Sequence, residues 1–341
     1  MSYRDADVIV AGGGPVGLAA AIEARLAGLS VIVVEPREGP VDKACGEGLM
    51  PGALPLLARL GVDPDGMPLA GVSYRDGARR VDHLFETGPG RGVRRTALHS
   101  ALAARAVEAG VTVLERRVES VEQDATGVST ADLRGSWLLG CDGLHSTVRS
   151  AAGMARGAPE RLRRYGIRRH AEMEPWGDLV EVYWTPRAEV YITPVAPRLV
   201  GVAVLGPAGT DFDAAIASVP ELARRLDGVT WATARRGAGP FRQRARRVRD
   251  GRVLLIGDAS GYVDAITGEG LRLGFDHARA AVASLVGDVD YEREWRRVSR
   301  DFRSLTSGLV TAASGPLRAG IVPLAARAPR LFGAIVERLA R

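Results

Sequence analysis

The stretch that decides the fold occupies residues 7–35 and reads DVIVAGGGPVGLAAAIEARLAGLSVIVVE. It opens with a continuous apolar run, which is typical of a strand buried on both faces of a parallel sheet. The turn Gly12-x-Gly14-x-x-Gly17 then leads into an alanine-rich helix with a proline in its first turn. A second apolar strand follows the helix and ends at Glu35. This order of elements predicts a doubly wound α/β domain.

The glycine turn also predicts a nucleotide-binding site. Gly12 permits the tight turn, Gly14 lets a pyrophosphate approach the backbone near the positive end of the helix, and Gly17 allows close packing of helix on sheet. Glu35, twenty-three residues after Gly12, is placed to accept hydrogen bonds from ribose hydroxyls. This motif alone does not separate NAD from FAD.

A second glycine-rich region lies at residues 254–281 and reads LLIGDASGYVDAITGEGLRLGFDHARAA. A short strand ends at Gly257-Asp258, and the loop of residues 267–270 leads into a helix. Between the two regions, residues 141–149 (CDGLHSTVR) follow another strand. Two such turns in one chain indicate either two bound nucleotides or one long cofactor held at both ends.

In order and spacing, these three motifs resemble the three fingerprints of FAD-dependent enzymes of the p-hydroxybenzoate hydroxylase fold, over most of the chain. The resemblance implies that both glycine regions hold one FAD molecule, with its adenosine and pyrophosphate at the first turn. Asp258 would accept from a ribityl hydroxyl. The helix that begins near Gly270 would stabilise negative charge on the reduced ring through its amides and dipole. NAD(P)H would then bind only transiently, as it does in this superfamily's hydroxylases.

The same resemblance extends the expected site. Arg95, at the start of a helix, matches the family's arginine near FAD, and Val118 matches the position whose backbone faces adenine. The expected cofactor-binding residues are Gly12, Gly14, Pro15, Val16, Gly17, Glu35, Pro36, Arg37, Lys43, Ala44, Cys45, Arg95, Val118, Asp142, Gly143, Gly257, Asp258, Gly268, Glu269, Gly270 and Leu271. The candidates for a catalytic role are Cys45, Gly46 and Glu269. No metal-ligand spacing occurs in the sequence, so we expect no metal.

The most individual stretch is DKACGEGLMP, residues 42–51. It resembles a lysine–x–cysteine–glycine segment of geranylgeranyl reductases and a glycine–glutamate segment of squalene epoxidases and flavin halogenases. In these enzymes the loop passes close to the flavin. Cys45 is therefore either a thiol in the pocket near the reacting atom or a small buried residue that packs a tight loop.

A change of pattern defines the expected domains. Between residues 160 and 236, stretches such as DLVEVYW and RLVGVAVLG alternate in the manner of an antiparallel sheet, and a parallel-type strand returns at RVLLIG. We expect a discontinuous FAD-binding domain over residues 1–71, 92–159 and 246–288. A substrate domain would comprise residues 72–91 and 160–245, and helices would fill residues 289–341. Within the first domain, we expect one of the strands at 118–123.

Composition narrows the class of protein. The net charge of +6 comes almost wholly from scattered arginines, and no nucleic-acid-binding module accompanies them. Two distant cysteines argue against a disulfide framework and favour a reducing cytoplasm. The chain starts without the apolar core of a signal peptide, and no apolar run approaches the ~18 residues of a membrane helix. The apolar, basic tail is expected to pack over the substrate cleft rather than rest on a membrane.

The five histidines offer no clear catalytic base. His99, His145 and His277 fall inside helices or the second fingerprint, where a structural role is expected. His83 and His170 lie in the expected substrate domain. A lone histidine there is more often a surface residue than a base.

Three functions stay open at this point. The first is an NAD(P)H-dependent FAD monooxygenase that uses O2 to hydroxylate a small apolar aromatic or polyketide-like compound, in secondary metabolism. The second is a reductase of isoprenoid double bonds, favoured by residues 42–51 and 267–271. The reductases' aromatic pocket motif argues against it, because only Tyr191 survives here. The third is a flavin-binding partner protein without turnover, which the intact Asp258 and Glu269 loops disfavour.

Overall fold

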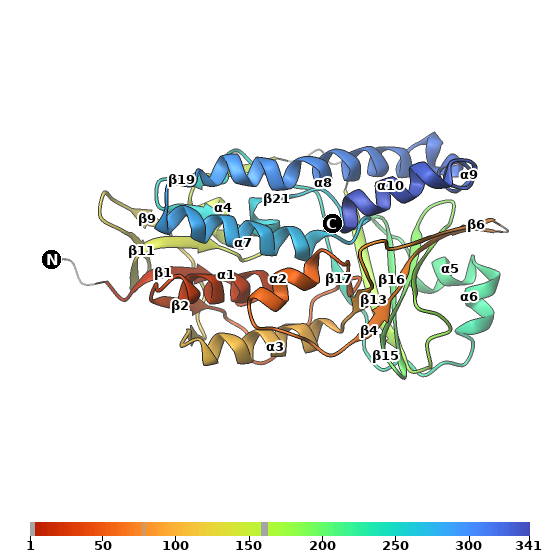
Figure 1. Ribbon diagram of the computed structural model, residues 1–341, viewed down its shortest axis with the longest axis horizontal. Helices are drawn as coiled ribbons and strands as arrows, with labels where there is room; N and C mark the ends of the chain where they lie inside the picture. The colour runs from red at the N-terminus through yellow and green to blue at the C-terminus, as the bar shows by residue number, and fades with distance from the viewer. Residues whose placement is uncertain (1–3, 78, 158–162) are drawn as a thin grey trace.

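The computed structural model describes residues 4–77, 79–157 and 163–341. It is elongated, with a parallel sheet and its helices at one end and a second large sheet at the other (Figure 1). The expected α/β fold class is confirmed. The expected domain boundary at residues 159 and 160 lies outside the described residues.

The first sheet has the strand order β19-β20-β11-β1-β2-β8, with β10 and β9 attached beside β11. Strand β1 pairs in parallel with β2 and β11, as expected of a doubly wound sheet. Val8, Ile9 and Val10 in β1 are fully buried, because layers cover both faces of the sheet. The strands are β1 (Ala6–Ala11), β2 (Val31–Val34), β8 (Thr112–Leu114), β9 (Glu122–Gln123), β10 (Val128–Thr130), β11 (Leu133–Gly140), β19 (Arg249–Asp250) and β20 (Val253–Leu255).

The expected strand at 118–123 is only partly present. Just its last two residues form β9, which pairs with β10 alone. Val118 instead buries its side chain in an apolar cluster with Val34 and Val128. Val118 is therefore held by apolar side-chain packing and not by strand pairing.

Helices cover one face of this sheet. Helix α1 lies between α3 and α7, and its apolar residues join the largest buried cluster of the described chain (Figure 1). The helices associated with this part are α1 (Pro15–Leu26), α2 (Ala53–Arg59), α3 (Arg95–Glu108), α4 (Thr147–Ala151), α7 (Gly270–Val286) and the short 3-10 helix η2 (Gly257–Ser260). The carboxyl end of β1 leads directly into the glycine turn at residues 12–17, and that of β20 leads into the region that begins at Gly257.

The second large sheet has the order β17-β13-β16-β15-β14-β5-β6. It was expected to be antiparallel, but β14 and β5 pair in parallel, from Leu179 opposite Gly71 to Tyr183 opposite Arg75. A parallel pair needs a long connection, which the hundred residues between these strands provide. The strands are β5 (Gly71–Asp76), β6 (Arg79–Leu84), β13 (Arg164–Ala171), β14 (Leu179–Trp184), β15 (Glu189–Ala196), β16 (Leu199–Pro207) and β17 (Arg236–Ala238).

Strand alternation gives this sheet two apolar faces. In β16, Val202 and Val204 pack outward beneath helices α5 (Phe212–Ala217) and α6 (Pro220–Arg225). Ala203 and Leu205 point the other way, into a separate buried cluster that faces the first domain. The inner face therefore supplies an apolar wall.

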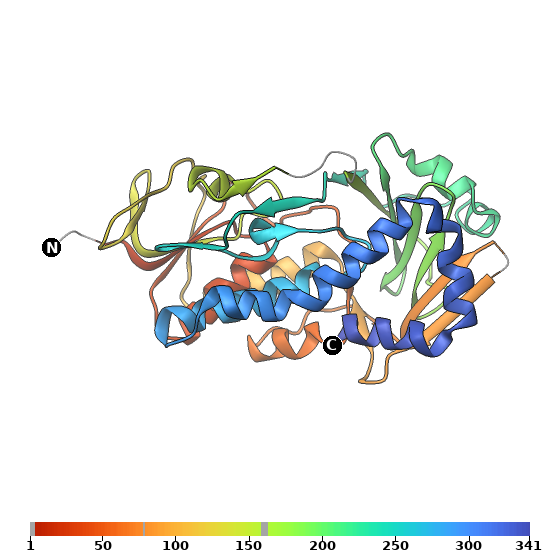
Figure 2. The same cartoon turned by 90° about the horizontal axis from the view of Figure 1, so that it is seen from above.

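Short strands and a helical tail connect the two parts. The small sheets contain β3 (Gly48–Leu49), β4 (Met67–Leu69) and β7 (Gly90–Gly92), and β12 (Ala155–Arg156), β18 (Gln243–Ala245) and β21 (Gly261–Tyr262). The tail comprises α8 (Tyr291–Ala313), η3 (Pro316–Gly320), α9 (Ile321–Arg327) and α10 (Pro329–Ala340). Figure 2 shows α8 running along the molecule and α10 turning back toward its middle. In the described ranges no single helix is long and apolar enough to span a membrane, although the bent pair Tyr291–Ala313 and Pro316–Arg327 passes by length and composition.

Candidate active site

A cavity of about 410 Å³ lies between the parallel sheet and the seven-stranded sheet. It gathers segments that are far apart in sequence, including both glycine regions, the 42–51 stretch and the start of α3. The expected site residues that line it are Gly12, Gly14, Pro15, Val16, Glu35, Arg37, Lys43, Ala44, Cys45, Gly46, Arg95, Asp142, Gly143, Asp258, Gly268, Glu269, Gly270 and Leu271. Gly17, Pro36, Val118 and Gly257 are not part of the lining.

The carboxylate of Glu35 organises the first glycine turn. Its Oε2 accepts from the backbone N–H of Gly13 at 2.9 Å, and its Oε1 accepts from Arg37 Nε at 2.7 Å. Burial opposes ionisation of Glu35, but the hydrogen bond and charge of Arg37 outweigh it and lower the pKa of this carboxyl. The first-turn amides of α1 have no partner within the helix, which suits an anionic ligand such as a pyrophosphate.

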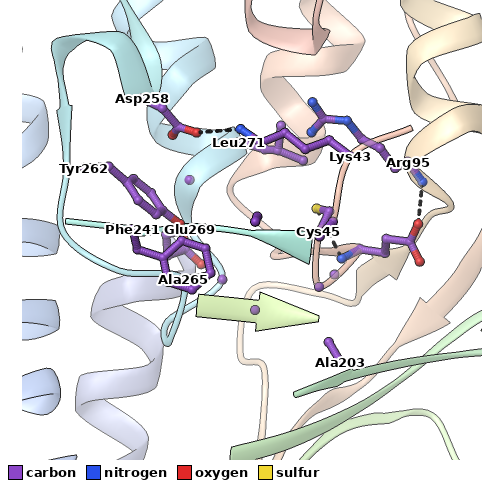
Figure 3. A pocket seen from close by; sticks show the side chains of 18 of the residues that line it. Lys43, Cys45, Arg95, Ala203, Phe241, Asp258, Tyr262, Ala265, Glu269 and Leu271 are labelled. Carbon is purple, nitrogen blue, oxygen red and sulfur yellow. Dashed lines mark hydrogen bonds and ion pairs between the residues drawn. The ribbon is translucent and has the colours of Figure 1, made fainter. Parts of the chain in front are cut away.

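Lys43 and Asp258 face each other across the cavity. Their Nζ and Oδ2 atoms are 3.8 Å apart, and Figure 3 shows Lys43 reaching Asp258 from the segment that also carries Cys45. Lys43 is the only lysine of the sequence, and the other 45 of its 46 basic residues are arginines. Cys45 is half-buried in the cavity wall, and its Sγ accepts from the backbone N–H of Glu47 at 3.4 Å.

Glu269 stands at the N-cap position of α7, but its side chain makes no capping hydrogen bond to the helix. Its side chain is buried, and its Oε2 accepts from Arg272 Nε at 2.7 Å. Burial raises the pKa of Glu269 to about 7, against the opposing charge and hydrogen bond of Arg272. The start of α7 thus combines an uncapped helix N-terminus with a carboxyl that titrates near neutrality.

Four buried polar atoms of residues in the cavity lining have no hydrogen-bond partner within the described part of the chain. They are Arg95 Nε, Asp142 Oδ1, Arg168 Nε and Glu269 Oε1. Buried polar atoms are normally satisfied. A ligand rich in phosphate, hydroxyl and ring-nitrogen groups would provide the missing partners, so the lining fits FAD.

The remaining part of the cavity is apolar. Its wall comes from the inner face of the seven-stranded sheet, the loop after β21 and helix α10, namely Met50, Val72, Tyr74, Val180, Val182, Tyr191, Thr193, Ala203, Leu205, Phe241, Tyr262, Ile266, Val336, Leu339 and Ala340. None of these side chains is charged, whereas the charged Glu47 and Arg168 and the imidazole of His145 line other parts of the cavity. Tyr191 donates to the carbonyl of Ile266 at 2.9 Å, and burial raises the pKa of Tyr74 well above its usual value.

Sequence reasoning missed a buried group beside Cys45. His170 was expected at the surface, but its side chain is fully buried and its Nε2 lies 2.6 Å from Glu47 Oε2. Arg168, two residues earlier in β13, is buried as well. The signal was the alternation of RYGIRRHA, which places Arg168 and His170 on one face, where charged groups must find partners. His83, the other candidate, is only partly exposed and lies 2.8 Å from Glu337.

A dinucleotide turn, an acid after β20 and an apolar compartment beneath a large sheet define a flavin-binding oxidoreductase fold. Residues 5–288 match the family described as FAD binding domain, and the chain belongs to this family. The expected FAD-dependent family and its FAD cofactor are thereby confirmed.

Three relatives illustrate the range of proteins similar to this chain. A dialkyldecalin synthase from Streptomyces rugosporus is 30% identical over 298 residues, covering 80% of this chain and 63% of that protein. A 12-dehydrotetracycline 5-monooxygenase/anhydrotetracycline 6-monooxygenase from Streptomyces rimosus is 30% identical over 321 residues, covering 80% and 61%. A menaquinone reductase from Mycolicibacterium smegmatis is 29% identical over 335 residues, covering 85% and 79%. The chain thus spans about three fifths of the first two relatives.

Solved structures agree on the fold. A flavoprotein/dehydrogenase from Cytophaga hutchinsonii superposes with a TM-score of 0.84 at 19% identity, covering 98% of this chain and 92% of the other. A p-nitrophenol 4-monooxygenase from Pseudomonas putida gives a TM-score of 0.81 at 20% identity, covering 100% and 99%. At this identity the likeness concerns architecture alone.

Proposed function

We propose that this protein is an FAD-dependent monooxygenase that uses NAD(P)H and O2 to hydroxylate a small, uncharged aromatic or polyketide-like compound in secondary metabolism. The observation that carries the proposal is that one cavity has two kinds of lining. One compartment is lined by the residues expected to hold FAD, and we define the second by the uncharged side chains named above; Glu47, His145 and Arg168 also line the cavity. A substrate bound in the second compartment would lie next to the cofactor and away from water.

The chain's own residues would hold FAD along the polar compartment. The first turn of α1, with Gly14, would take the pyrophosphate, and Asp258 would accept from a ribityl hydroxyl. The start of α7, at Gly270, would face the ring. FAD supplies the redox chemistry when bound, accepting a hydride from NAD(P)H and reacting with O2. The protein's part is to orient the substrate and exclude water.

The apolar compartment indicates which substrates fit. A charged substrate would lose its hydration against this wall, and the charged Glu47 and Arg168 of the cavity lining already pair with His170 and Asp42, which disfavours such a substrate strongly. The Tyr74 hydroxyl lines this compartment and is free of protein hydrogen bonds among the described residues, so it is available to one polar group of a substrate. The monooxygenase named for tetracycline compounds among the relatives supports the polyketide-like class.

The second candidate is an FAD-dependent reductase of isoprenoid double bonds. It is supported by Cys45 in the cavity wall and by the relative named a menaquinone reductase, of which this chain covers 79%. A flavin-binding partner without turnover is the third candidate. The buried Glu269 disfavours it, since a purely structural flavin site does not need a carboxyl of raised pKa near the ring.

Oxygen dependence separates the two enzymes. The protein is reduced under anaerobic conditions, a candidate substrate is added, and the flavin spectrum and product mass are followed. For a monooxygenase, the substrate stays unchanged until O2 is admitted and then gains one oxygen atom. If the flavin reoxidises without O2 and the product gains two hydrogens, the reductase is the correct function.

A further inference from the structure

The turn that carries Cys45, residues 42–47, is attached to the opposite side of the cavity by buried charged contacts. The carboxylate of Glu47 is the centre of this attachment. Its Oε2 lies 2.6 Å from His170 Nε2 on β13, and its Oε1 accepts from the backbone N–H of Arg95 at 2.8 Å. One side chain therefore joins the turn, the seven-stranded sheet and the start of α3.

The tautomer of His170 follows from its neighbours. Arg168 Nη1 lies 3.2 Å from His170 Nδ1, and a guanidinium can only donate, so Nδ1 must be the accepting nitrogen. The ring proton then sits on Nε2 and points at the carboxylate of Glu47. Thr233 Oγ1, 3.1 Å from Nδ1, lies on the same side of the ring as the guanidinium. The contact between His170 and Glu47 is thus a charge-assisted hydrogen bond with a fixed direction.

A second contact attaches the same turn to the same strand. Arg168 donates from Nη2 to the carboxylate of Asp42 and, at 3.4 Å, to the carbonyl of Lys43. Arg236 also lies 3.4 Å from Asp42. The guanidinium of Arg168 is buried, and its Nε is 4.0 Å from Glu47 Oε1. Asp42 and Glu47, the first and last residues of the turn, therefore both lie next to the same cation.

The backbone at Glu47 shows that the turn is held rather than relaxed. Its φ is +60°, a left-handed conformation that a residue with a Cβ adopts only where its surroundings demand it. In this conformation its N–H contacts Cys45 Sγ and its carbonyl accepts from Val93 at 2.8 Å. The side-chain contacts of Glu47 and the position of Cys45 are therefore mechanically connected.

We propose that Glu47 and His170 are positioning residues that act as a clamp, holding Cys45 and the start of α3 in place against the cofactor compartment from the seven-stranded sheet. Loss of the clamp would loosen the turn while leaving both sheets folded. The proposal rests on the proposed function in one respect, namely that the flavin ring lies against this turn. The clamp itself is testable in the protein without FAD.

Four variants form a matched set. His170→Gln keeps an N–H donor at the position of Nε2, whereas His170→Leu removes it at similar volume. Glu47→Gln keeps the shape of the side chain but replaces one accepting oxygen with an N–H donor. This donor would face another donor, either the Arg95 backbone N–H or His170 Nε2–H. The His170 ring cannot change tautomer to accept it, because Arg168 donates to Nδ1. Glu38→Gln is the control, since Glu38 is exposed. Circular dichroism and thermal unfolding verify that each variant is folded.

The readout is the rate at which iodoacetamide alkylates Cys45 in the FAD-free protein, measured by mass spectrometry. Cys141 is buried, so it serves as an internal reference. Because a charge-assisted hydrogen bond is broken, we expect alkylation of Cys45 to be about tenfold faster in His170→Leu and Glu47→Gln. In His170→Gln and Glu38→Gln, the rate of Cys45 alkylation should stay within about twofold of the wild-type rate. A change of this size is too small for the loss of a charge-assisted hydrogen bond.

Affinity for FAD gives a second readout. We expect the FAD dissociation constant to rise about tenfold in the two clamp-breaking variants and to recover in His170→Gln. Unchanged Cys45 alkylation in folded His170→Leu and Glu47→Gln would overturn the clamp, as would a His170→Gln protein that behaves like His170→Leu. Protection of wild-type Cys45 by FAD is a separate measurement, and its absence would count against the flavin placement in the proposed function.

Discussion

Gly14 and Gly17, both in the first glycine turn, differ in whether the packing around them leaves room for a side chain. At Gly17 a Cβ would lie 1.8 Å from the carbonyl oxygen of Gly12, so the bare backbone is what lets α1 approach its own turn. At Gly14 the backbone is extended, and a Cβ would meet only Arg95 Nη2, at 3.8 Å. The fold therefore needs Gly17, whereas the packing around Gly14 does not require a glycine, as expected if this position serves the proposed pyrophosphate site.

This contrast gives the first prediction. Gly14→Val should fold with nearly unchanged stability, but its branched side chain should occupy space near the pyrophosphate and weaken FAD binding by at least about tenfold. Gly17→Ala should instead lower the free energy of unfolding by about 1–3 kcal/mol through overpacking. Urea unfolding and flavin fluorescence titration measure the two effects. A Gly14→Val protein with full FAD occupancy would show that the turn does not hold the pyrophosphate.

Asp258 is a second residue whose proposed role is to bind the cofactor. Its side chain is 30% exposed and its protein partner, Lys43, is 3.8 Å away, so it contributes little to the fold. Asp258→Ala should remove a charge-assisted bond of about 1.5–3 kcal/mol to a ribityl hydroxyl and weaken FAD binding roughly 10–100-fold. Asp258→Asn, which keeps an acceptor, should lose less. An equal dissociation constant in Asp258→Ala and wild type would reject this assignment.

At the scale of elements, the start of α7 carries an unusual balance. A helix N-terminus favours a carboxylate, yet burial dominates and raises the pKa of Glu269 to about 7. The carboxyl is therefore partly protonated at neutral pH, next to the site where the helix is expected to face the flavin. Negative charge that develops on a ring bound there would favour the protonated form of this carboxyl.

The raised pKa has a measurable consequence for stability. Below pH 4.5 both folded and unfolded chains hold the proton on Glu269, and as the pH rises toward 7 only the folded chain keeps it. Ionisation thus favours the unfolded chain, and stability decreases through this window. Relative to Glu269→Gln, the wild type should lose about 3 kcal/mol between pH 4.5 and pH 8. Asp264, which burial also affects, is present in both proteins and cancels.

Urea unfolding of the FAD-free proteins across this pH range tests the expectation. Glu119→Gln serves as the control because Glu119 is exposed, and it should track the wild type. If the difference between Glu269→Gln and wild type were independent of pH, Glu269 would not titrate as its burial requires.

The scale of whole elements also shows what a sequence can predict here. The turn around Gly12 and the start of α7 were predicted because their signals lie within a few neighbouring residues. The contact between Glu47 and His170 joins residues 123 positions apart, and the local alternation around His170 gives its face of the strand but not its partner. The parallel pairing of β5 with β14 was missed for the same reason, since strand alternation gives a face but not a partner.

At the scale of the whole molecule, the C-terminal tail completes the cavity. Helix α10 returns from the far end and places Val336, Leu339 and Ala340 in the apolar compartment (Figure 2). The backbone N–H of Gly52 donates to the carbonyl of Ala340 at 2.7 Å, so the last residues of the helix are attached to the first domain. The sequence predicted a helix over the cleft, and its buried anchor, Glu337, came only from the structure.

Glu337 is the anchor on which the last prediction rests. Its Oε1 lies 2.8 Å from His83 Nε2 and accepts from the backbone N–H of Glu86 at 3.0 Å, both at the end of β6. Glu337→Ala should lower the free energy of unfolding by about 2–3 kcal/mol and speed amide exchange within α10. The affinity for FAD should not change, because α10 lines only the apolar compartment. The yield of product per NAD(P)H consumed should fall as water enters.

Arg338→Ala is the matched control on the same helix. Arg338 pairs with Asp301 at the surface, so its loss should alter stability by no more than about 1 kcal/mol and leave the product yield intact. Hydrogen exchange read by mass spectrometry locates the change to residues 329–341. Equal exchange in Glu337→Ala and Arg338→Ala would show that α10 is held by its apolar face alone, and the tail would then be a fixed wall of the cavity that needs no buried anchor.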